Sequence, residues 1–143
     1  MGARQVSVGA AFRTRMLAVS AVTTITSEIH QDHVPTGTAL PYYRFSVIGG
    51  APHHHVGAAS PIGEAAIQLD AYAATGSVRD AMAEAARHAL DGWAGTSATV
   101  GIDQIILDPP ANSVEGLDAG RESPTFRSRI DARVFFAQAA PTL

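Results

Sequence analysis

The feature that most constrains the fold is an alternation of apolar and charged residues over residues 125–136. The two kinds of side chain occupy opposite parities of the segment, namely Phe126, Ile130, Ala132, Val134 and Phe136 against Arg127, Arg129, Asp131 and Arg133. Because successive side chains of a β-strand point to opposite faces of the sheet, this period predicts a strand with one buried and one polar face. The chain is therefore expected to build a sheet that is covered on one face only, as antiparallel sheets commonly are.

Other segments predict further strands of the same sheet. In residues 65–73 the two parities again differ, with Ile67, Leu69 and Ala71 on one face and Gln68, Asp70 and Tyr72 on the other. Residues 42–48 follow Pro41 and are rich in aromatic and β-branched side chains, which favour strands. Residues 99–107 predict another strand, and Ile29-His30 predicts a short extended piece.

Two segments predict helices. Apolar residues recur at helical spacing over residues 78–91, and most of them are small, so this helix is expected to lie close on the sheet. Ser77 is the expected N-cap, with Asp80 completing a short-armed capping box. Gly92 supplies the expected stop. Residues 5–22 predict an N-terminal helix, because apolar side chains fall on one of its faces.

Two stretches between these elements are rich in turn-forming residues. Gly49-Gly50-Ala51-Pro52 is expected to end the preceding strand, and residues 53–64 predict a hairpin tip or mobile loop. Residues 109–124 are polar and rich in Gly and Pro, and a loop of this length is expected to be functional or disordered. The sequence therefore predicts an α+β fold with a mostly antiparallel sheet, an N-terminal helix and a second amphipathic helix, in the order α-β-β-β-α-β-β. One domain is expected to cover residues 1–143.

Composition excludes several functional classes. The 143 residues are 46% hydrophobic and 16% charged, which suits an ordered domain. There is no cysteine, so disulfides and thiolate chemistry are impossible, and all ten basic residues are arginine, so lysine chemistry is excluded. The net charge of −3 weighs against a general nucleic-acid-binding domain. The sequence contains no apolar run of about 18 residues, so no membrane-spanning helix is expected.

Three consecutive histidines, His53-His54-His55, are the most conspicuous local feature. Imidazoles bind metals, but adjacent residues of an extended chain point to opposite sides, so a structural or polar loop is the favoured interpretation. His30 and His33 could complete a metal site only if the fold brings them close. No phosphate-binding loop, nucleophile elbow or zinc-protease motif is present. A non-enzymatic protein without a cofactor or metal is therefore expected.

The arginines of residues 125–136 have two interpretations. They could form a solvated face that pairs with Asp70 or other acids on neighbouring strands. Alternatively, they could form an interface row that pairs with acids of a neighbouring subunit or faces passing DNA. Asp131 interrupts the row, which weakens the DNA version.

Several short signatures, in this order and over residues 25–136, resemble the tail-completion or tail-terminator family of tailed phages, prophages and gene transfer agents. They are the Ile-x-x-x-x-Val-Pro segment Ile29–Pro35, the Leu-Pro-Tyr-Tyr of 40–43, the Gln-x-Asp-x-Tyr strand within 67–73, the helix end at 89–92 and the final strand 126–136. The histidine triplet and the stretch 109–124 are not markers of this family.

The resemblance implies a structural virion protein with no catalytic residues. Such a protein forms a ring, expected to be hexameric, at the head-proximal end of the tail tube, where it stops tube polymerisation and joins tail to head. The implied partners are further copies of the chain, the major tail tube protein and the head–tail connector protein, with transient contact with DNA in the lumen as a further expectation. Assembly is expected in the cytoplasm of a bacterial host, without a membrane.

The last strand and the 109–124 stretch are expected to make subunit contacts, and the 49–64 stretch to line the lumen or touch the tube. The candidate interface residues are Arg127, Arg129, Arg133, Asp70, His53, His54, His55 and Arg121. Within the same class, a head–tail connector, neck or minor tail protein is the alternative. From other classes, a small metal- or ligand-binding protein using the histidines, or a generic oligomeric α+β domain, remains open.

Overall fold

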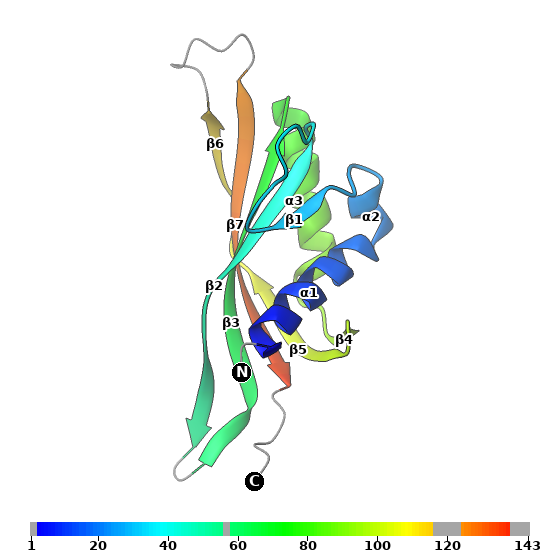
Figure 1. Cartoon of the computed structure of the whole chain (residues 1–143). Coiled ribbons are helices and arrows are strands. Elements are labelled where there is room, and N and C mark those ends of the chain that lie inside the picture. Colours follow the sequence, from blue (N-terminus) through cyan, green and yellow to red (C-terminus); the bar gives the residue numbers. More distant parts are fainter. Residues whose placement is uncertain (1–2, 56–57, 116–123, 138–143) are drawn as a thin grey trace.

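The computed structural model describes residues 3–55, 58–115 and 124–137, and the side chains of 8–49, 63–115 and 124–137. Within these residues a seven-stranded sheet carries its helices on one face (Figure 1). The helices are α1 (Ala3–Leu17), α2 (Ser20–Thr23) and α3 (Gly76–Leu90). The strands are β1 (Ile29–Gln31), β2 (Tyr42–His55), β3 (Ala58–Ala73), β4 (Gly95–Ser97), β5 (Val100–Leu107), β6 (Ala111–Glu115) and β7 (Thr125–Ala137).

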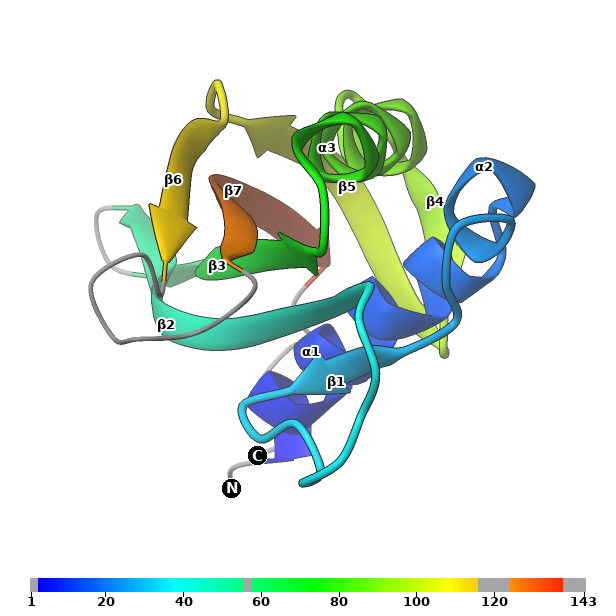
Figure 2. The ribbon, with the colours of Figure 1, turned by 90° about the horizontal axis from the view of Figure 1, so that it is seen from above.

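The sheet has the order β1-β2-β3-β7-β5-β4, and β6 also pairs with β7. Every pairing is antiparallel except that of β1 with β2. One edge of β7 pairs with β3, while its other edge pairs with β6 along residues 125–129 and with β5 along residues 132–136. The sheet is curled, and α1 and α3 lie on the same side of β3 and β7 (Figure 2). The predicted α+β class with an antiparallel-rich sheet is confirmed, but the described order adds α2, β4 and β6.

The alternation in β7 and β3 sets which face the helices cover. In β7 the even residues from Ser128 to Val134 are buried, and in β3 the odd residues from Gly63 to Ala73 are buried. Side chains from α1, α3 and the sheet complete one core, in which the rings of Phe12 and Phe45 lie with centroids 5.1 Å apart. The predicted faces of both strands are therefore confirmed.

The N-terminal helix is shorter than the predicted segment 5–22. It ends at Leu17, and Val19 has extended backbone angles, φ −106° and ψ 119°, before the single turn of α2 begins. A β-branched residue adopts such angles readily. The change of direction allows Val22 to be fully buried.

The second helix begins earlier than predicted. Thr75 is the N-cap, because its hydroxyl accepts a hydrogen bond from the backbone N–H of Val78 at 3.2 Å. The predicted cap at Ser77 and its capping box with Asp80 are therefore wrong, since Ser77 lies inside the first turn. The predicted stop is confirmed: Gly92 has φ +76°, a conformation that glycine adopts without steric cost.

Small residues let α3 pack closely on the sheet, as predicted. Ala85, Ala86 and Ala89 are buried with Met82 and Leu90. The hydroxyl of Tyr43 in β2 donates a hydrogen bond of 2.7 Å to the backbone carbonyl of Met82. Burial raises the pKa of Tyr43, because an ionised phenolate would be poorly solvated there.

Replacing Tyr43 with phenylalanine is expected to lower the free energy of unfolding by about 1 kcal/mol, because it removes one buried hydrogen bond without changing the ring. Urea unfolding followed by circular dichroism measures the loss. Tyr42→Phe is the matched control, since the ring of Tyr42 packs on Tyr72 and its hydroxyl makes no hydrogen bond to a described residue. Equal effects of the two substitutions would contradict the assignment.

Residues 53–64, predicted as a hairpin tip or mobile loop, do belong to a hairpin, but in the described residues they are mostly paired strand, and the predicted stop at 49–52 is wrong. β2 and β3 continue to His55 and Ala58, with irregularities between Val47 and Gly49 and between Pro52 and His54. The resulting hairpin arm, residues 47–63, projects beyond the helices (Figure 1). It contains no Asp, Glu, Lys or Arg.

The predicted loop at 109–124 is corrected over residues 111–115, while residues 116–123 lie outside the described residues. Pro109 and Pro110 follow β5, and the chain then returns as β6, whose Ser113 lies opposite Arg127 of β7. A strand of this length offers little periodicity, so its pairing depends on the free edge of β7 rather than on its own sequence. None of the helices in the described residues has the length and apolarity to cross a membrane.

Candidate interaction surface

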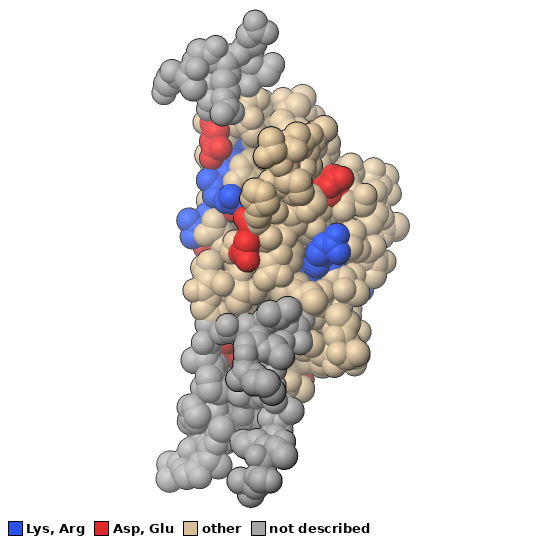
Figure 3. Space-filling view, in the orientation of Figure 1, with Lys and Arg blue, Asp and Glu red and all other residues tan. Residues whose placement is uncertain are grey.

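The face of the sheet opposite the helices, here called the bare face, gathers charged side chains of both signs. They lie beside one another close to β6 and β7 (Figure 3). The odd residues of β7 supply Arg127, Arg129 and Arg133 to this face, as the alternation predicted. Their surroundings differ, because the side chain of Arg127 is 24% exposed whereas that of Arg129 is 48% exposed.

Asp70 is the centre of a buried charge network on the bare face. Its side chain is only 2% exposed. One carboxylate oxygen accepts hydrogen bonds from Nε and Nη2 of Arg127, at 3.0 and 2.8 Å. The other oxygen accepts from Nε2 of Gln68 at 3.1 Å and lies 3.6 Å from Nη2 of Arg44. The carboxylate is thus held by donors from β2, β3 and β7, so its burial is compensated.

Glu115 extends the network to β6. Its carboxylate lies 3.1 Å from Nη1 of Arg127. Burial by itself would lower the pKa of Arg127, but the hydrogen bonds to Asp70 and Glu115 raise the pKa above its ordinary value. The guanidinium therefore stays charged and ties β6 to β7 and β3.

Two tyrosines pack beside these charges. The rings of Tyr42 and Tyr72 have centroids 5.1 Å apart, and the guanidinium of Arg127 lies 5.6 Å from the Tyr72 ring. Burial raises the pKa of Tyr72, and the negative charge of Asp70 adds to this effect. The phenol accordingly stays neutral and serves as a packing surface for cations.

The network distinguishes between the two interpretations of the arginine row at Arg127 only. Arg127 is paired with Asp70, as the solvated-face interpretation expected, although the pair is buried rather than solvated. Arg129 makes only an ion pair of 3.3 Å with Asp131 on its own strand, where both side chains are about half exposed. Arg133 is exposed and makes no hydrogen bond or ion pair with any described residue. The outer part of the row is therefore available to a partner.

The histidine triplet has strand backbone in β2, but the side chains of His53, His54 and His55 lie outside the described residues, as does the whole of Arg121. Their proposed roles stay predictions. His30 pairs with Glu28 at 2.7 Å. No three metal-ligating side chains come together among those that the structure describes.

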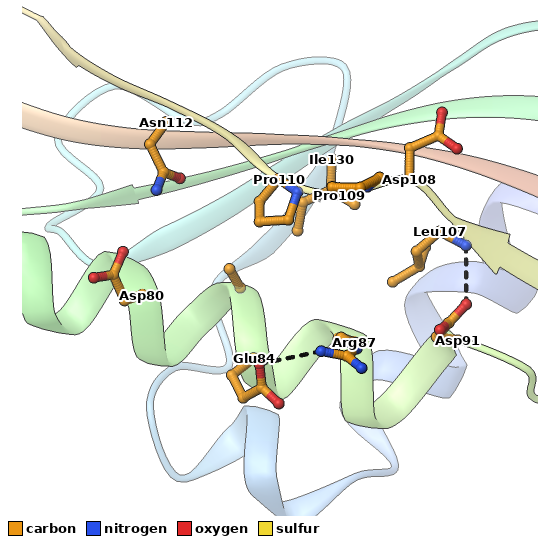
Figure 4. Close-up of a pocket in the computed structure, with 11 residues that line it drawn as sticks. Asp80, Glu84, Arg87, Asp91, Leu107, Asp108, Pro109, Pro110, Asn112 and Ile130 are labelled. Atoms are coloured by element: carbon orange, nitrogen blue, oxygen red, sulfur yellow. Dashed lines mark hydrogen bonds and ion pairs between the residues drawn. The ribbon is translucent and has the colours of Figure 1, made fainter.

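A groove of about 500 Å³ opens on the helix side, between α3 and the chain that leads from β5 into β6 (Figure 4). Ala83, Leu107 and Ile130 supply apolar lining, and the prolines 109 and 110 form part of the opposite wall. Four carboxylates and one guanidinium also line it, namely Asp80, Glu84, Asp91, Asp108 and Arg87. No sequence pattern indicates this groove, because one of its walls depends on the chain that leads into β6, a segment that the sequence predicts as loop.

Sequence reasoning also missed two members of the charge network. Arg44 lies directly opposite Asp70 in the pairing of β2 with β3, but this register is visible only in the fold. Glu115 was hidden in the predicted loop. The polar face that Asp70 shares with Gln68 and Tyr72 is the one signal for this network in the sequence.

Comparisons with known proteins agree with this architecture. The family model described as tail completion protein gp17 matches residues 10–132. A solved chain from the virion of a native gene transfer agent (GTA) particle has the same fold at a TM-score of 0.62 and 18% identity, covering 90% of this chain and 97% of that one. A second solved structure covers 96% of this chain and 98% of its own, at a TM-score of 0.57 and 16% identity. No curated protein matches.

Proposed function

Because the chain belongs to the tail completion protein gp17 family, we propose that it forms the ring that closes the head-proximal end of a phage-type tail tube. Family membership assigns it a tail-associated structural role, which argues for a non-enzymatic protein. In the proposal the ring stops tube polymerisation and joins the tail to the head. The family match over residues 10–132 carries the proposal, and the likeness in fold to a gene transfer agent virion chain supports it.

Open strand edges support self-assembly. β1 covers β2 only from Tyr43 to Phe45, so the outer edge of β2 beyond this point has no partner strand within the described residues. The outer edge of β6 is likewise open in the described part of the chain. Because the two edges are different surfaces, contacts that use them would be head-to-tail and could close as a ring. Six copies is the number expected from the family resemblance.

The hairpin arm is the part that we assign to the tail tube or the lumen. It projects from the body, and its lack of Asp, Glu, Lys and Arg suits an interface core, where charged residues are depleted. β7 and the 109–124 stretch are assigned to neighbouring copies, and the head–tail connector would contact the remaining end of the ring. DNA in the lumen would make only transient contacts, because the net charge is −3. Assembly would take place in the host cytoplasm.

Deleting the gene is expected to give particles with overlong or ragged tails and filled heads that carry no tail. The physical reason is that an uncapped tube keeps its polymerisation surface and offers no surface for joining to the head. Electron microscopy of the particles, with tail lengths measured from the images, provides the measurement. Expression of the wild-type chain from a second locus is the control and should restore normal length.

The outcomes separate the alternatives. Tails of normal length beside unattached heads would favour a head–tail connector or neck protein instead of a terminator. Intact particles with tails of normal length would overturn the proposal.

A further inference from the structure

The groove on the helix side and the exposed arginines on the bare face have opposite charge, and we propose that they meet between copies. In this proposal, which rests on the proposed ring, the carboxylate-lined groove of one copy receives the side chains of Arg133 and Arg129 from the β7 of the next copy.

The groove has the properties of an arginine acceptor. Its four carboxylates and one guanidinium give a formal charge of −4 + 1 = −3. Three of the four carboxylates have a contact among the described residues: Asp80 pairs with Arg79 at 3.1 Å, Glu84 lies 3.9 Å from Arg87, and Asp91 accepts a hydrogen bond from the backbone N–H of Leu107 at 3.1 Å. The last two contacts are drawn in Figure 4, and the pairs of Asp80 and Glu84 are exposed, so both acids can exchange partners. The apolar lining would pack against the methylene stem of an arginine, while the carboxylates would bind its guanidinium.

The arginine side fits for a complementary reason. Among the arginines whose side chains are described, Arg133 makes no hydrogen bond or ion pair, whereas every other one has such a contact. Arg129 is held only by the exposed pair with Asp131, which is worth little and is easily exchanged. Two residues of the same parity on one strand would thus enter the groove from the same direction.

The placement of the two surfaces predicts the symmetry of the contact. The groove floor includes Ile130, on the helix side of β7, whereas Arg129 and Arg133 project from the opposite side of the same strand. The two contacting surfaces therefore lie on opposite sides of each copy, so the contact cannot join identical patches of two copies. A contact between unlike patches repeats from copy to copy and either closes as a ring or continues as a filament.

The chain contains no cysteine, so introduced cysteines are the only reactive thiols of this protein in a crosslinking test. A Glu84→Cys/Arg133→Cys variant replaces the wild-type chain in assembled particles, which are then treated with a short bismaleimide whose spacer stands in for the lost side chains. The expected result on a denaturing gel is a ladder of multiples of 14.9 kDa. The single variants and His88→Cys/Arg133→Cys, in which the α3 position is exposed but does not line the groove, should give no ladder.

Charge exchange provides an independent second measurement. Arg133→Glu alone and Glu84→Arg alone are each expected to lower the fraction of particles with normal tails by about tenfold or more, because like charges would then face each other. The combination of both substitutions should restore that fraction to within about threefold of wild type.

These experiments test the subunit contact separately from the proposed function. Normal particles that give no ladder, a crosslink to a different protein, or a double exchange that fails to restore tails would each overturn the contact. If deletion of the gene disturbs the tails but the Arg133→Glu chain complements it fully, the contact fails while the proposed function stands.

Discussion

Replacing Asp70 with alanine is expected to lower the free energy of unfolding by about 3 kcal/mol, at the lower end of what removal of one member of a buried ion pair costs. The substitution would leave the guanidinium of Arg127 without its two shortest hydrogen bonds. Arg127 and Arg44 keep about a quarter and two fifths of their side chains exposed, and Glu115 still pairs with Arg127, so water and Glu115 offset part of the loss.

Thermal unfolding measures this effect, and a midpoint lower by about 10 °C is expected for a chain of this size. Asp131→Ala is the matched control, because it removes an aspartate from an arginine on the same face of the sheet, but in a pair that is half exposed on both sides. The control should cost less than about 1 kcal/mol. Similar losses of unfolding free energy for the two variants would mean that the buried ion pair of Asp70 contributes no more than an exposed one, which would contradict the network.

Replacing Phe45 with alanine is expected to cost about 3–5 kcal/mol, which for a chain of this size approaches the whole stability of the fold. Phe45 is fully buried in β2, and its ring contacts that of Phe12 in α1. The loss combines the transfer of the ring to water with the cavity that remains between helix and sheet. Urea unfolding of the full chain gives the free energy difference.

Ile48→Ala provides the matched control on the same strand, because Ile48 is 58% exposed and should cost less than about 1 kcal/mol. A double-mutant cycle with Phe12→Ala then isolates the contact between the rings, for which a coupling of about 0.5–1.5 kcal/mol is expected. Strict additivity of the two losses would mean that α1 is held by other contacts.

The elements that the sequence predicted correctly are those whose burial repeats with a regular period. In β7 and β3 the alternation is clear over residues 129–134 and 67–72, where apolar residues alternate with charged or polar ones. The helix at α3 was equally clear, yet its first residue was misplaced by two positions, because Thr75 and Ser77 both carry a hydroxyl suitable for capping. The choice between them depends on where the chain leaves β3, which is a tertiary property.

The elements that the sequence missed are stabilised by pairing rather than by their own residues. The hairpin arm contains Gly49, Gly50, Pro52 and Pro61, residues typical of loops, but antiparallel pairing of the flanking strands continues through them. β6 forms because β5 leaves the first half of β7 uncovered. The candidate site divides in the same way. The alternation in β7 places Arg127 on the bare face, as predicted, whereas its partner Glu115 and the groove depend on β6 and could not be predicted.

The position of β7 in the sheet has a consequence for folding during synthesis on the ribosome. This strand pairs with β3 on one side and with β5 and β6 on the other, yet it is the last described element of the chain. Until residues 125–137 leave the exit tunnel, no strand connects β3 and its partner β2 with β5 and its partner β4, and β6 has no strand to pair with. Long-range pairing of this kind is slow. The nascent chain therefore keeps apolar strand edges uncovered until the late pairing of β7 completes the sheet. Translation that stops before residue 125 is expected to yield a species for chaperones and proteases rather than a smaller folded protein.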